Sequence, residues 1–89
     1  MNYHATQKQT DLTDTTIMTI AFDAMEAVRG GDVEVREFTT RLKRAYATAD
    51  GRDDRHGKKR LRFIEGFLGE QLEARGDADL ANTLNIFYG

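Results

Sequence analysis

The stretch "KKRLRFIEGFLGEQLEARG", residues 58–76, decides the fold that we expect for this chain of 89 residues. Its aliphatic residues recur at intervals of three and four positions, which places them along one side of an α-helix. They are Leu61, Ile64, Leu68 and Leu72. Gly76 ends the pattern, because glycine readily adopts the backbone conformation in which helices terminate. The stretch therefore predicts an amphipathic helix that begins near Lys58 and ends at Gly76.

Two further stripes of the same spacing precede this helix. The first comprises Ile17, Ile20, Ala21, Ala24, Met25 and Val28. The second comprises Val35, Phe38, Leu42, Ala45, Tyr46 and Ala49. Between them, Gly30 and Gly31 are expected to supply the positive φ of a tight turn, and Asp32 to cap the second helix. The second helix should end near Asp50 and Gly51.

A short fourth helix is expected after Gly76, with Asp77 as its cap and Leu80, Leu84 and Phe87 facing inward. Short turns join the first helix to the second and the third to the fourth, so that residues 50–57 form the one long connection. The predicted fold class is therefore all-α, a small bundle of about four helices built from two αα-hairpins.

The domain organisation follows from length and composition. Residues 1–10 are polar and are expected to form a flexible N-terminal arm, while 11–89 form a single helical domain, because the chain is too short for two cores. The chain has no cysteine and no apolar stretch like that of a signal peptide, which favours a cytoplasmic location. No run approaches the roughly 18 apolar residues of a membrane span, so no membrane partner is expected.

Basic residues gather in one segment, although the chain carries a net charge of −2. Residues 41–62 contain three Asp and nine Lys or Arg, and the nine form a candidate macromolecule-binding patch: Arg41, Lys43, Arg44, Arg52, Arg55, Lys58, Lys59, Arg60 and Arg62. We expect them at one end of the bundle. Lys58, Lys59 and Arg60 would lie at a helix N-terminus, where the helix dipole favours anions. Cations at that position favour binding of an acidic protein surface or of a nucleic-acid backbone. The alternative is that residues 41–62 form a solvated, charged loop that binds no partner.

Four residues of the third helix form a candidate interface: Phe63, Gly66, Phe67 and Gly69. The two rings lie well off the leucine stripe, either because a central helix needs a broad core face or because they contact a partner, including a second copy in a homodimer. Each glycine inside a helix costs about 0.5–1 kcal/mol relative to alanine. Two of them within one turn indicate close approach of another backbone, from the same chain or from a partner.

Catalysis finds little support in the sequence. His4 lies in the polar arm and His56 in the basic segment, with no second histidine at the spacing of metal ligands. Asp53 and Asp54 are too few for a metal site, and no nucleophile lies at local spacing from a base. We therefore expect no catalytic residue, metal or cofactor, and no enzymatic activity.

These observations favour a non-catalytic small helical accessory protein that binds another macromolecule and modulates or inhibits a protein complex. The alternative is a nucleic-acid-binding regulator that contacts the phosphate backbone through residues 41–62. The short chain and the preference for Arg over Lys are typical of accessory proteins of bacteria and phages. The expected partner is a protein with an acidic surface, or nucleic acid.

Overall fold

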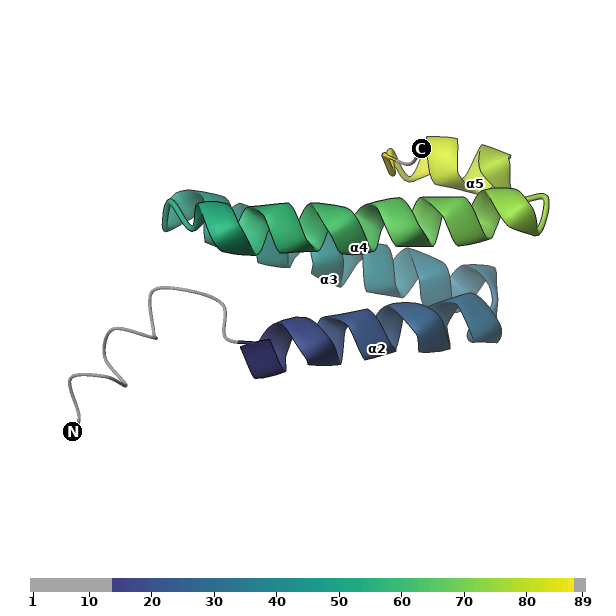
Figure 1. Ribbon diagram of the computed structural model, residues 1–89. Coiled ribbons are helices and arrows are strands. Elements are labelled where there is room, and N and C mark those ends of the chain that lie inside the picture. Colours follow the sequence, from purple (N-terminus) through teal and green to yellow (C-terminus); the bar gives the residue numbers. More distant parts are fainter. Residues whose placement is uncertain (1–13, 88–89) are drawn as a thin grey trace.

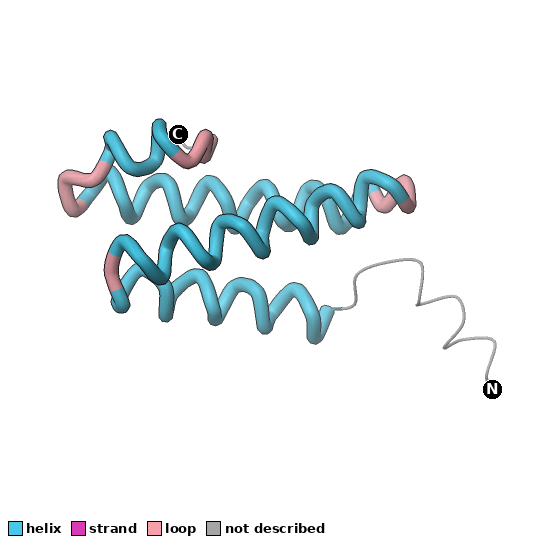
Figure 2. Tube along the Cα trace, turned by 180° about the vertical axis from the view of Figure 1, so that it is seen from behind, coloured by secondary structure: helices cyan, strands magenta, loops and turns pink. Residues whose placement is uncertain are grey.

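A computed structural model describes residues 14–87, which form four helices and no strand. The helices are α2 (Asp14–Gly30), α3 (Asp32–Gly51), α4 (Arg55–Ala74) and α5 (Ala78–Thr83). The three long helices contact one another in every pairing, and α5 folds back along α4 (Figure 1). The view from behind shows the same order of helices (Figure 2). The predicted all-α bundle is thus confirmed, while the predicted arm at residues 1–10 lies outside the described residues.

The core fills the space between α2, α3 and α4. The predicted leucine stripe of α4 is buried there, and the largest fully buried side chains are Val35, Phe38, Leu61, Leu68 and Leu72. Burying each such side chain contributes about 1.5–3 kcal/mol, and this burial, more than helix propensity, stabilises three helices of at most 20 residues.

Two residues that we expected in the core are exposed. Met25 lies at the edge of the α2 stripe, and the smaller Ala27 is buried in that helix instead. Phe87 is exposed because α5 ends at Thr83, so that helical spacing no longer applies after it. Asn85 has a φ of +58°, and the chain then turns so that Ile86 is buried and its N–H donates to the Ala81 carbonyl at 2.9 Å.

The two turns at one end of the bundle are tied together by Arg75. Its guanidinium donates to the Val28 carbonyl, to Asp32 at 3.1 Å and to Asp77 at 2.9 Å. Asp32 is therefore not the cap that we expected. Gly31, with a φ of +112°, is the capping residue of α3, and Asp32 is the first residue of that helix.

The connection between α3 and α4 is shorter than expected. Helix α4 begins at Arg55, so His56 and Gly57 belong to the helix and the connection spans only 52–54. Asp54 is buried and caps α4, because its Oδ1 accepts a hydrogen bond of 2.9 Å from the Gly57 N–H. The N-terminus of α4 therefore already holds an anionic group of its own chain.

Candidate functional site

Large apolar side chains stand exposed on α2, α4 and the residues after α5. We call them the apolar surface; they are Met18, Phe22, Met25, Phe63, Phe67 and Phe87. Phe63 is 82% exposed and lies outside the core, whereas Phe67 is 38% exposed, so that more than half of it is covered by the chain itself. Groups of exposed large apolar residues on a helical protein mark sites of interaction with other molecules.

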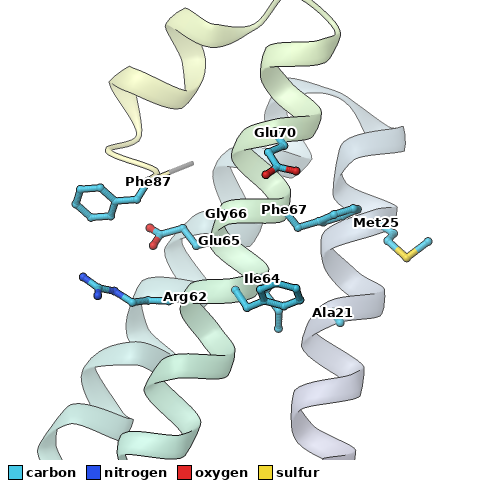
Figure 3. A pocket seen from close by; sticks show the side chains of 10 residues that line it. Ala21, Met25, Arg62, Ile64, Glu65, Gly66, Phe67, Glu70 and Phe87 are labelled. Atoms are coloured by element: carbon cyan, nitrogen blue, oxygen red, sulfur yellow. The ribbon is translucent and has the colours of Figure 1, made fainter. Parts of the chain in front are cut away.

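Part of the apolar surface forms a groove of about 750 Å³. Met25 of α2, Phe63 and Phe67 of α4, and Phe87 line it. Figure 3 shows the Phe67 ring directed toward Met25, with Phe87 on the opposite side of α4. The groove thus joins α2, α4 and the C-terminal residues into one apolar depression.

Gly66 lies between the two sides of this groove (Figure 3). Among the described residues, a Cβ atom built on it would meet only the Phe87 carbonyl oxygen, at 3.9 Å, which is an ordinary contact. Gly69, in contrast, is buried and lies roughly 60° nearer to the leucine stripe on a helical wheel. Gly69 therefore does not belong to the exposed surface, and only Gly66 remains beside the two rings.

Gly66→Ala is expected to raise the free energy of unfolding by up to about 1 kcal/mol, because alanine is the better helix former and the space beside Gly66 is sufficient. Urea denaturation followed by circular dichroism measures this. A loss of stability would mean that the C-terminal residues pack more closely on Gly66 than the contact distance indicates.

The nine basic residues do not gather at one end of the bundle as we expected. Arg41 lies ten residues before the end of α3, about 15 Å along the helix axis. Because α4 begins at Arg55, Lys58, Lys59 and Arg60 are the fourth to sixth residues of the helix and not its first. The patch therefore extends along half of α3 and the first half of α4.

Several of these cations interact within the chain. Lys43 Nζ donates to the Asn85 carbonyl at 3.0 Å and pairs with Glu65 at 3.4 Å, which ties the C-terminal residues to α3 and α4. Lys58 pairs with Asp50 at 2.9 Å, and this hydrogen bond raises the pKa of the lysine. The Arg41 guanidinium lies 5.9 Å from the centre of the Phe38 ring.

Arg52 and Arg60 also have partners. Besides Arg41, which contacts the Phe38 ring, four of the nine form no ion pair with another residue of the described range 14–87: Arg44, Arg55, Lys59 and Arg62. The last three recur at intervals of four and three positions, so they share one side of α4. The patch is thus divided between cations that hold the bundle together and cations available to a partner.

The contribution of α2 to the apolar surface was not predicted from the sequence. Met18, Phe22 and Met25 follow the spacing i, i+4, i+7, which is a helical stripe of its own beside the core stripe. This second stripe can be recognised in the sequence, but Met25 was assigned to the core stripe instead.

No three His, Cys, Asp or Glu side chains come together as metal ligands within residues 14–87. In the same range, no helix has the length and apolar character needed to cross a membrane. Comparisons with protein-family models, with curated proteins and with solved structures found no match to this chain.

Proposed function

We propose that this chain acts without catalysis, by binding another protein and thereby modulating or inhibiting a protein complex. The observation that carries the proposal is the apolar surface. The core between the three long helices is complete without it, since Leu61, Leu68 and Leu72 are each at most 1% exposed. Exposed rings and methionines that are not needed for folding favour the association of a partner, because burying them there removes apolar area from water.

The chemistry of the surface also indicates the kind of partner. Methionine side chains are flexible and adapt to differently shaped apolar surfaces, and Met18 and Met25 flank Phe22 on α2. Unpaired cations on α4, including Lys59 and Arg62, favour approach of an acidic surface and accelerate association. The expected partner presents apolar side chains within an acidic rim.

A second candidate function is binding of a nucleic-acid backbone through residues 41–62. The observation that favours it is the row of unpaired cations on α4, Arg55, Lys59 and Arg62. Two features weigh against it: Asp54 already caps the N-terminus of α4, and Glu70 and Glu73 continue the same side of the helix. Their carboxylates would repel phosphates.

We therefore expect no mobility shift of a generic duplex or single strand at micromolar protein in about 50 mM salt. A shift that weakens steeply with salt would support the second function instead. In that case Lys59→Ala with Arg62→Ala should reduce the log–log salt slope by about two, because each substitution leaves one phosphate without its cation.

Affinity capture from a lysate of the source cells, with and without nuclease, tests the first function against the second. The proposal predicts at least one stoichiometric protein that is retained after nuclease treatment. If nuclease treatment removes every captured protein, the proposal is contradicted, because nucleic acid would then bridge this chain and those proteins.

A further inference from the structure

We propose that a second copy of this chain docks antiparallel on the outer face of α4, with the two helices crossing at Gly66. The face shares Lys59, Arg62 and Phe63 with the surface of the proposed function, but the inference does not depend on that function, because it rests on the order of charges along α4 and is tested on the pure protein. The outer face is defined by residues on the side of α4 opposite its buried leucines: Lys59, Arg62, Phe63, Gly66, Glu70 and Glu73.

These residues share one face because they recur at intervals of three or four positions, within an arc of about 100° on a helical wheel. Gly66 is half-buried and the others are exposed. Neither cation and neither carboxylate of the face forms an ion pair with another described residue. Their charges are available to a partner.

The order of the charges along the face is symmetric about Gly66. Lys59 and Arg62 lie seven and four residues before it, and Glu70 and Glu73 lie four and seven residues after it. With a rise of 1.5 Å per residue, cations and carboxylates stand about 6 and 10.5 Å from the crossing point, on opposite sides.

An antiparallel second copy therefore brings the two cations of each chain opposite the two carboxylates of the other. A twofold axis repeats this arrangement on both sides of the crossing, as in an isologous dimer. A parallel arrangement places like charges opposite each other and is disfavoured. The face is thus complementary to itself in one orientation only, which is the argument for a second copy as its occupant.

The centre of the face is apolar and has room for a side chain. Phe63 is the most exposed large apolar side chain of the described residues, and it stands one turn from Gly66. Both residues line the groove, whose ends carry Arg62 and Glu70. Because Gly66 has no side chain, the two helices can approach closely at the crossing, and the twofold axis places the Phe63 ring of each copy opposite position 69 of the other, which is also a glycine.

Sedimentation analysis of the pure wild-type protein between about 1 and 200 µM tests the proposal, because a dimer of moderate affinity dissociates within that range. We expect reversible dimers. A chain that remains monomeric throughout overturns the proposal, and so do dimers that nuclease dissociates, since nucleic acid would then bridge the copies.

Two charge-reversed variants test the orientation. In one, Lys59→Glu is combined with Arg62→Glu; in the other, Glu70→Lys is combined with Glu73→Lys. Each variant alone places like charges opposite each other, and its dissociation constant should rise at least about tenfold. An equimolar mixture restores opposite charges on both sides of the crossing and should dimerise as the wild type does.

The control variant carries Arg29→Glu and Arg36→Glu at exposed positions of α2 and α3, away from the outer face, and changes the net charge by the same amount as Lys59→Glu with Arg62→Glu. It should dimerise normally. Wild-type dimers together with a mixture that stays monomeric would contradict the antiparallel arrangement. Circular dichroism of each variant establishes that it is folded. The sedimentation measurement on the wild-type protein decides whether the chain dimerises, even if a variant fails to fold.

Discussion

Leu68→Ala is expected to lower the free energy of unfolding by about 2–5 kcal/mol, whereas Phe63→Ala should change it by less than about 0.5 kcal/mol. Both residues belong to α4 and lie five positions apart, but Leu68 is fully buried and Phe63 is 82% exposed. Leu68→Ala leaves a cavity between the three long helices, while Phe63→Ala removes a ring that mostly contacts water. For a small domain with a total stability of about 5–15 kcal/mol, the first loss is a large fraction.

Urea denaturation at a low protein concentration, where self-association does not contribute, measures both changes. The comparison decides between the two interpretations of the off-stripe rings. A loss above about 2 kcal/mol for Phe63→Ala would show that the ring is part of a broad core face. The apolar surface would then lose its most exposed member.

Asp54→Ala is expected to lower the free energy of unfolding by about 1–2 kcal/mol, because the Gly57 N–H loses its capping acceptor. Gly57→Ala should also destabilise the protein, by up to about 1 kcal/mol, although alanine is the better helix former. The reason is that a Cβ atom on Gly57 would collide with the Asp54 carboxylate. Gly66→Ala is the matched control, since that position of the same helix has room.

Combining the two substitutions tests the cause. In the double variant Asp54→Ala with Gly57→Ala the carboxylate is absent, so the collision disappears and the two losses should not add. Additive losses would mean that Gly57 is required for some reason other than space for the Asp54 side chain. Thermal or urea denaturation of the three variants completes the cycle.

The sequence predicted the bundle because aliphatic residues recur at helical spacing in each of the three long helices. The stripe of α4 is buried as expected, from Leu61 to Leu72. The predicted start of α4 was wrong because glycine is a poor helix former, so we placed Gly57 outside the helix. Gly57 instead lies in the first turn, where its N–H donates to the Asp54 carboxylate, and residue spacing does not reveal this hydrogen bond.

The candidate site was only partly predictable. A helical wheel separates Phe63 and Phe67 from the core stripe, but whether another helix covers them depends on how α2 and α5 pack. The availability of the cations depends likewise on tertiary contacts. Lys43 pairs with Glu65, 22 residues away, and with the carbonyl of Asn85, 42 residues away. No local pattern predicts such partners.

The most direct test of the account compares partner capture by Phe22→Ser with capture by Val33→Ser. Phe22 and Val33 are similarly exposed, at 61% and 64%, but Phe22 belongs to the apolar surface and Val33 lies on α3. Both variants should keep the wild-type melting temperature within about 4 °C, because neither substitution opens the core. The account predicts that Phe22→Ser loses a protein that the wild type and Val33→Ser retain from nuclease-treated lysate. Equal retention of every captured protein by all three would contradict it.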